Sequence, residues 1–245
     1  MTRWLKLSLA VGLVGIVLAG FQAYTLIAGR NALVRDFKRA AAQEAARAAN
    51  EIDEQLRRCA ATADSLAAEL GSGSVGPDEV EGRLRAVVEG EPEVLTVGVA
   101  HDPTVLGRLR APAVTRREGS VRALQLEDTR DYTAPEELWY HEALREGPGW
   151  RRPSWSEIAG SMTVVYSTVY SAPFLDREDG ERPTPGGVVF VAVSLNRMRD
   201  RVDELDTGAL GWGGILSREG HYLVHPNEER VEDPATLLEV LDARG

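Results

Sequence analysis

The feature that most constrains this chain is an uncharged run near its N-terminus, Leu7 to Ala28 (LSLAVGLVGIVLAGFQAYTLIA). About 20 apolar residues are enough for a helix to cross the hydrocarbon core of a bilayer. A cleaved signal peptide is the alternative, because Val17-Leu18-Ala19 resembles a cleavage site. The apolar region of a signal peptide, however, is only about 7–15 residues long. The longer run therefore predicts an uncleaved transmembrane helix over 7–28.

The flanking charges do not settle the orientation of this helix. Two basic residues, Arg3 and Lys6, precede it, and five follow it: Arg30, Arg35, Lys38, Arg39 and Arg47. Taken alone, the positive-inside rule would keep the C-terminal part in the cytoplasm. The rule weakens for long translocated domains, so charge alone leaves the orientation open.

Residues 29–70 have the pattern of one long stalk helix. Apolar residues recur at heptad spacing, at intervals of 4, 3, 4, 3 and 4, at Ile52, Leu56, Cys59, Ala63, Leu66 and Leu70. The Ala-rich segment 40–49 adds helix propensity. The stripe fits packing against the chain's own domain as well as pairing with a second copy. A homodimer through the stalk is therefore one of two expectations, and in both Cys59 is a small apolar residue.

The remaining pattern predicts an α+β fold. Segment 71–76 (GSGSVG) matches a nucleotide-loop motif, but it follows a helix rather than a strand, so it predicts a turn. Helices are expected at 77–89, 135–145 and 196–205. Strands are expected at 95–100, 121–126, 163–171, 187–195, 212–217 and 221–225, the last two forming a hairpin. Strands of this kind with interposed helices are typical of an antiparallel sheet.

Several function classes are disfavoured by composition and spacing. The formal net charge of −10 opposes binding to nucleic-acid phosphates. His221 and His225 are four residues apart in a strand-like segment, without an evident third metal ligand. Ser167 and Ser171 lack the Gly-x-Ser-x-Gly elbow of a hydrolase. We therefore expect no catalysis, no metal and no cofactor.

Aromatic residues provide the best candidate site. Trp139, Tyr140, Trp155, Tyr166 and Tyr170 fall within 32 residues of a chain that is 6% aromatic. Such rings line small-molecule pockets, and the alternative is that they form the core. Tyr166 and Tyr170 are expected to share one face of a strand, because successive side chains alternate.

Two carboxylates accompany these rings. Glu137 lies two residues before Trp139, and Glu157 lies two residues after Trp155. At the mouth of a pocket they would favour a cationic or polyhydroxy ligand. The alternative is that both are solvated surface residues.

Six motifs follow the predicted anchor and stalk in a fixed order. They are Val97–Ala100, Asp131-Tyr132 with Trp139-Tyr140, Trp155–Glu157, Tyr166-Ser167 with Ala172–Phe174, Gly187–Leu195, and Ser217–Pro226. This order resembles the double Cache (dCache) extracytoplasmic sensor domain over roughly residues 30–240. It is similar to the sensors of bacterial histidine kinases, chemoreceptors and serine phosphatases that regulate anti-sigma factors.

The resemblance implies a layout. Residues 1–6 would be cytoplasmic, 7–28 transmembrane and 29–70 the stalk. Residues 77–205 would form a membrane-distal PAS-like ligand-binding lobe, and 206–245 the start of a truncated membrane-proximal lobe. The bulk of the chain would lie in the periplasm, anchored by a single span in the inner membrane.

The implied function is small-molecule sensing in transmembrane signalling, with the output domain missing from this chain. Two alternatives stay open: a membrane-anchored periplasmic hydrolase, and a structural stalk protein that dimerises without a ligand. Amino-acid-binding members carry an Arg and an Asp that grip the carboxylate and the ammonium; here Glu137 and Ala192 occupy those positions. The resemblance therefore implies that a free α-amino acid is not the ligand.

Overall fold

The computed structural model describes residues 2–76, 78–117, 119–157, 164–176, 184–205, 211–217, 220–227 and 229–232. In the first 32 residues it describes the side chain of Gln22 and those of residues 29–30. The predicted span at 7–28 is helical backbone, but apart from Gln22 its side chains lie outside the described residues. Among the residues that are described, no helix combines the length and the apolar character needed to cross a membrane.

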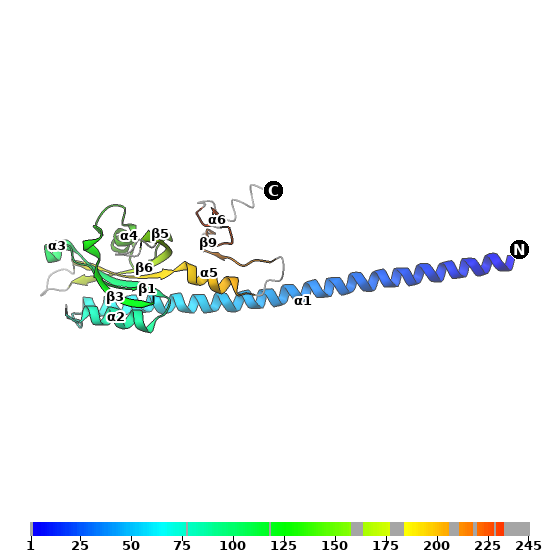
Figure 1. The fold of residues 1–245 in the computed structure, drawn as a ribbon, viewed down its shortest axis with the longest axis horizontal. Coiled ribbons are helices and arrows are strands. Elements are labelled where there is room, and N and C mark those ends of the chain that lie inside the picture. Colours follow the sequence, from blue (N-terminus) through cyan, green and yellow to red (C-terminus); the bar gives the residue numbers. More distant parts are fainter. Residues whose placement is uncertain are drawn as a thin grey trace.

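A single helix, α1 (Thr2–Gly71), contains the predicted stalk and extends beyond the rest of the molecule as a rod (Figure 1). Its C-terminal part packs on the sheet and buries Ile52, Cys59, Ala63 and Leu66. The predicted stripe is therefore confirmed, and it faces the chain's own domain. Pairing of two stalks would need another surface.

The helix ends where the Gly-rich segment begins. The backbone N–H of Ser74 donates to the carbonyl of Glu69 at 2.9 Å, and that of Gly73 donates to Leu70 at 3.0 Å. Gly73 has φ +68°, a left-handed conformation that glycine adopts at little cost. Segment 71–76 is thus a helix terminator that leads into α2, as the sequence predicts.

The remaining elements form an α+β fold with two antiparallel sheets. The helices are α2 (Val80–Gly90), α3 (Pro103–Leu106), the 3-10 turn η1 (Leu126–Asp128), α4 (Leu138–Glu146), α5 (Leu195–Asp203) and α6 (Glu229–Glu232). The strands are β1 (Val94–His101), β2 (Pro112–Arg117), β3 (Ser120–Gln125), β4 (Gly149–Trp150), β5 (Ser154–Glu157), β6 (Val164–Asp176), β7 (Thr184–Ser194), β8 (Ile215–Leu216) and β9 (Tyr222–Val224).

The main sheet has the strand order β3-β2-β1-β7-β6-β4, with β5 also paired to β6. The smaller sheet is the predicted hairpin, in which Ile215 of β8 lies opposite Val224 of β9. The antiparallel α+β prediction is confirmed. The strand predicted at 121–126 is β3, whereas β2, β4 and β5 were not predicted. The lobe boundary near 205 stays a prediction.

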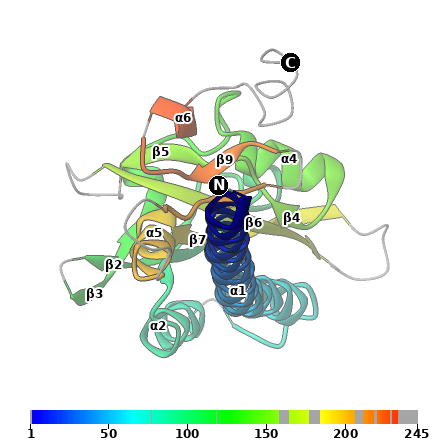
Figure 2. The same ribbon diagram turned by 90° about the vertical axis from the view of Figure 1, so that its right-hand side faces the viewer.

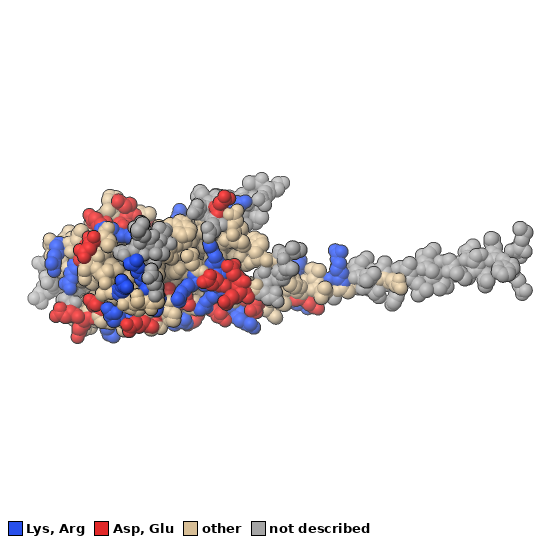
Figure 3. Space-filling view, viewed as in Figure 1, with Lys and Arg blue, Asp and Glu red and all other residues tan. Residues whose placement is uncertain are grey.

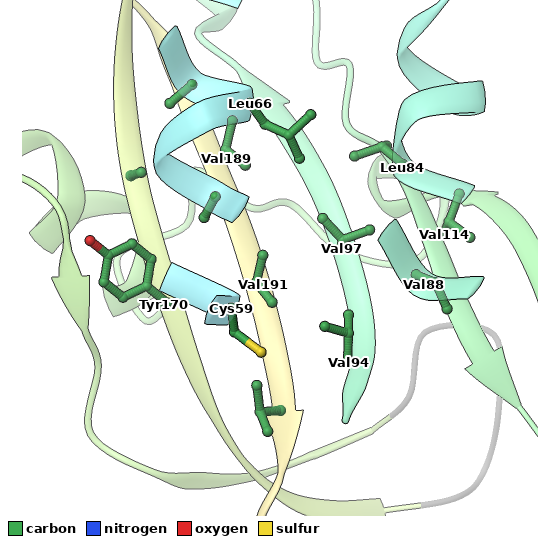
Figure 4. Close-up of a cluster of buried hydrophobic side chains, with 14 of the residues drawn as sticks. Cys59, Leu66, Leu84, Val88, Val94, Val97, Val114, Tyr170, Val189 and Val191 are labelled. Atoms are coloured by element: carbon green, nitrogen blue, oxygen red, sulfur yellow. The ribbon is translucent and has the colours of Figure 1, made fainter. Parts of the chain in front are cut away.

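Helices cover the two faces of the main sheet unequally. α1 and α2 cover one face, and α4 lies on the other (Figures 1 and 2). The central strand β7 is buried on both faces, which explains its nearly continuous apolar sequence. Its Val189 and Val191 point to α1 and pack with Cys59 and Leu66 (Figure 4). We call this side the stalk face and the opposite side the α4 face.

Charged side chains of both signs are interspersed over the visible surface of the lobe (Figure 3). On α1 many of them form exposed pairs one turn apart, such as Asp36–Arg39 at 3.8 Å and Glu44–Arg47 at 3.2 Å. Exposed pairs of this kind contribute little stability. The attachment of α1 to the lobe therefore depends mainly on the buried stripe.

Candidate ligand-binding site

Four aromatic side chains form a layer on the α4 face. They are Tyr132, Trp139, Tyr140 and Phe190, and we call them the aromatic layer. The ring centroids of Trp139 and Phe190 are 4.7 Å apart, those of Trp139 and Tyr140 5.8 Å, and those of Tyr132 and Tyr140 5.4 Å. Tilted and edge-to-face arrangements at these separations are favourable for aromatic rings. The layer joins α4 to the centre of the sheet.

The floor beneath Phe190 is a glycine. Gly98 of β1 lies opposite Phe190 of β7 and opposite Ala113 of β2. A Cβ atom placed on Gly98 would lie 2.6 Å from the Cε1 and Cζ atoms of Phe190 and 2.9 Å from the Cβ of Ala113. These separations are too short for real atoms, so the ring of Phe190 rests directly on the backbone of Gly98. The missing side chain makes room for the ring.

Tyr140 carries a polar atom that the fold leaves unpaired. Its side chain is 3% exposed, and its hydroxyl has no hydrogen-bond partner among the described residues. Burial raises the pKa of Tyr140 above its ordinary value, and the nearby Asp102 and Tyr132 raise it further, so the hydroxyl stays protonated. Buried polar groups are nearly always paired. An unpaired phenol in an aromatic layer is the arrangement that a ligand with a hydrogen-bonding group would complete.

The neighbouring Tyr132 shows the contrast. Its hydroxyl donates to the carbonyl oxygen of His101 at 2.7 Å and accepts from the backbone N–H of Arg110 at 3.0 Å. These two bonds fix the end of β1 to the start of β2. The hydroxyl of Tyr132 therefore uses its hydrogen bonds within the fold, whereas the hydroxyl of Tyr140 is unpaired among the described residues.

Glu137 lies at the start of α4, where its side chain is 15% exposed. Its Oε2 accepts a 2.6 Å hydrogen bond from the indole N–H of Trp139, and its Oε1 lies 3.5 Å from the guanidinium of Arg130. The carboxylate therefore fixes the orientation of Trp139, and Arg130 compensates its charge. The expectation that Glu137 favours a cation loses its basis, because that negative charge already has a partner.

The sheet separates the other predicted site residues from Trp139 and Tyr140. Tyr166 and Tyr170 share one face of β6, as expected, but it is the stalk face. The hydroxyl of Tyr170 donates to both carboxylate oxygens of Asp64 on α1 at 3.1 Å (Figure 4 shows the ring beside the helix). Burial, and to a smaller extent Asp64, raises the pKa of Tyr170 to about 12.

The β5 residues also lie away from the aromatic layer. Trp155 stands opposite Tyr166, with ring centroids 5.2 Å apart, and it is exposed. Glu157 is paired with Val164 at the end of β5, and its side chain lies outside the described residues. The structure therefore brings together Glu137, Trp139 and Tyr140, but not the whole predicted set.

Three hollows of the described residues lie outside the aromatic layer. One of about 560 Å³ is bounded by α1, α5 and residues 212–216, one of about 380 Å³ lies beside Asp64 and Phe174, and one of about 350 Å³ lies between α1 and α2. None of the three is lined by a residue of the aromatic layer, whose own side chains fill the space between α4 and the sheet. Within the described ranges there is also no group of three potential metal ligands.

Sequence reasoning missed Gly98 and Phe190. An isolated glycine within a strand pattern, as in LTVGVA, is a known sign of a bulge or of close approach by another group. The single aromatic residue in GVVFVAVSL is a second sign. Together they could have indicated that a ring lies across the centre of the sheet.

No protein-family model matches the sequence, and neither does any curated protein. Solved structures match in fold. The extracellular domain of soHK1S-Z6, described as a histidine kinase, gives a TM-score of 0.64 at 20% identity, over 82% of this chain and 77% of that one. A protein named Methyl-accepting Chemotaxis protein X gives 0.64 at 21% identity, over 83% and 80% of the two chains.

A third match is the ligand-binding domain of the Pseudomonas aeruginosa amino acid chemoreceptor PctC in complex with GABA. Its TM-score is 0.54 at 18% identity, over 80% of this chain and 76% of that one. At such identities the likeness concerns the fold alone. The fold is that of Cache-type extracellular sensor domains, as the sequence resemblance predicted.

Proposed function

We propose that this chain is the sensing module of a transmembrane signalling protein and that it binds a small molecule on its α4 face. Residues 7–28 would anchor it in the inner membrane, with the bulk of the chain in the periplasm. Solved structures with this fold include the extracellular domain of a histidine kinase and the ligand-binding domain of a chemoreceptor, which supports the proposal. An output domain would act from another part of the signalling protein.

The observation that carries the ligand site is the hydroxyl of Tyr140, which is buried in the aromatic layer without a partner. A buried hydroxyl that lacks a hydrogen bond costs about 1–3 kcal/mol. A ligand that pairs with this hydroxyl would recover part of that free energy on binding. Rings with a few polar groups are also the usual lining of small-molecule sites.

The charges around the layer support a ligand other than a free α-amino acid. Ala192 lies opposite Val169 of β6 and Thr96 of β1, where it cannot hold an ammonium group. Glu137 is paired with Trp139 and Arg130, so it supplies no positive charge that would bind the carboxylate of an amino acid. The PctC domain was solved with GABA, and the ligand-binding domain of a second Pseudomonas aeruginosa amino acid chemoreceptor, PctB, was solved with L-Gln and with L-Arg. We expect this chain to differ from both in its ligand class.

A thermal-shift screen of the purified full chain against metabolites tests the site. A ligand at 100 times its dissociation constant adds about 2.7 kcal/mol of stability. We expect a saturable shift that weakens in Tyr140→Phe and persists in Tyr170→Phe, which removes the same atom on the stalk face. A shift that is lost in Tyr170→Phe and kept in Tyr140→Phe would place the site on the other face, and saturable binding of common L-amino acids would contradict the ligand class.

The location is tested separately with alkaline phosphatase fused after Gly245. Activity in intact cells is expected, because the enzyme folds in the periplasm. An inactive fusion, with an active cytoplasmic reporter at the same joint, would reverse the proposed orientation.

A further inference from the structure

Phe190 occupies the centre of the α4 face. Its side chain is 6% exposed, and its ring lies on Gly98 with Trp139 as its aromatic neighbour. The flanking residues of β7 on this face are smaller: Val188 on one side and Ala192 on the other. Phe190 is therefore the side chain of β7 that fills the middle of the layer.

The residues beneath this ring are small. Ala100 of β1 and Ala111 and Ala113 of β2 belong to the same buried cluster, and Gly98 has no side chain at all. If the Phe190 ring moved aside, the exposed floor would be flat and apolar, with Trp139 beside it and Tyr140 on the far side of Trp139 in the aromatic layer. Such a space has the dimensions of one planar ring, because a benzyl group occupies it now.

We propose that Phe190 is a displaceable plug and that the ligand carries a planar ring that takes its place on Gly98. The proposal rests on the function proposed above and specifies the chemistry of its ligand. The ring of the ligand would pack against Trp139 as Phe190 does now, and one polar group on it would pair with the hydroxyl of Tyr140. Glu137 beside the layer is already paired with Trp139 and Arg130, so it requires no positive charge on the ligand.

A plug lowers the apparent affinity of its site. A ligand binds only the open state, so its apparent dissociation constant is the intrinsic one divided by the open fraction. Minor states of folded proteins are commonly populated at about 0.1–10%. Removing the plug should therefore raise affinity about tenfold or more.

Titration calorimetry of the full chain with indole tests the plug, since indole is planar and carries one N–H donor. We expect Phe190→Ala to bind indole about tenfold or more tightly than the wild-type chain. Adding Tyr140→Phe to that variant should weaken binding about 2–10-fold, the equivalent of one neutral hydrogen bond. The matched control is Phe174→Ala, which removes a buried Phe from the stalk face and should leave indole binding at the wild-type level.

If the wild-type chain and Phe190→Ala bind indole with equal affinity, or if Phe174→Ala gains as much affinity as Phe190→Ala, Phe190 is not a plug. If Phe190→Ala does not fold, Phe190→Leu should give a smaller gain, and no gain there is equally contrary. A metabolite could bind the wild-type chain through Tyr140 and bind the Phe190 variants with the same affinity. That result would contradict the role of Phe190 as a plug but would leave the proposed function standing.

Discussion

Replacing Tyr140 by Phe should make the unliganded protein more stable, although it removes a polar group from the proposed site. The hydroxyl is buried and has no partner among the described residues. Leaving such a group unpaired costs about 1–3 kcal/mol, and Phe keeps the ring contacts with Tyr132 and Trp139. For a chain of this size, each kcal/mol corresponds to a change of about 2–4 °C in Tm.

The matched control is Tyr132→Phe, because Tyr132 lies in the same layer but its hydroxyl is paired. That change leaves the carbonyl of His101 and the N–H of Arg110 without their 2.7 and 3.0 Å partner. We expect a loss of about 1–3 kcal/mol. Thermal unfolding followed by far-UV circular dichroism measures both variants. A Tyr140→Phe variant that loses as much stability as Tyr132→Phe would show that the Tyr140 hydroxyl has a partner, and the basis for the ligand site would be removed.

Three further predictions concern other parts of the molecule. Gly98→Ala should destabilise the fold by about 1–3 kcal/mol, because the added methyl group overpacks against Phe190. In a Phe190→Leu background the loss of stability should be smaller, which urea unfolding of the wild-type chain, both single variants and the double variant measures. An unchanged loss would mean that the added methyl group clashes with another residue. The pKa of Tyr170 is raised to about 12 in the folded chain, whereas the pKa of tyrosine in an unfolded chain is about 10. The stability that this shift contributes is present below about pH 10 and should be lost between about pH 10 and 12. Tyr170→Phe should therefore flatten the pH dependence of the free energy of unfolding in that window. Burial raises the pKa of Cys59 to about 11, so alkylation at neutral pH should be far slower in the folded than in the urea-unfolded chain. Equal rates would contradict the packing of Cys59 between α1 and the sheet.

The sequence predicted those elements in which the spacing of apolar residues follows the faces that are buried. The heptad stripe of α1 is buried against one surface, and the apolar run of β7 is buried on both sides. β2 was missed because it begins with Pro112 and ends with two arginines. An arginine fits at the end of this strand because the guanidinium of Arg116 donates to the carbonyl oxygens of Val88 and Glu91 at the end of α2.

The candidate site was predicted only in part, for a geometric reason. Alternation along β6 correctly placed Tyr166 and Tyr170 on one face, but it does not say which of the two faces that is. Both faces of the sheet are covered, so aromatic residues occur on each. The decisive contacts, Gly98 with Phe190 and Tyr170 with Asp64, join residues that are about 90 and 106 positions apart in the sequence. Only the strand order brings them together.

The uninterrupted α1 helix makes the angular phase between its two ends a fixed quantity. It has no proline from Thr2 to Gly71, and its last turns are buried against the sheet, so its azimuth there is set by the lobe. At 3.6 residues per turn, one residue inserted in the exposed segment near Ala40 would rotate everything before it by about 100°, whereas seven residues would return it to within about 20°. If the N-terminal end must present a particular side to neighbouring molecules, signalling should depend on insertion length with the period of the helix, while the fold of the lobe stays the same.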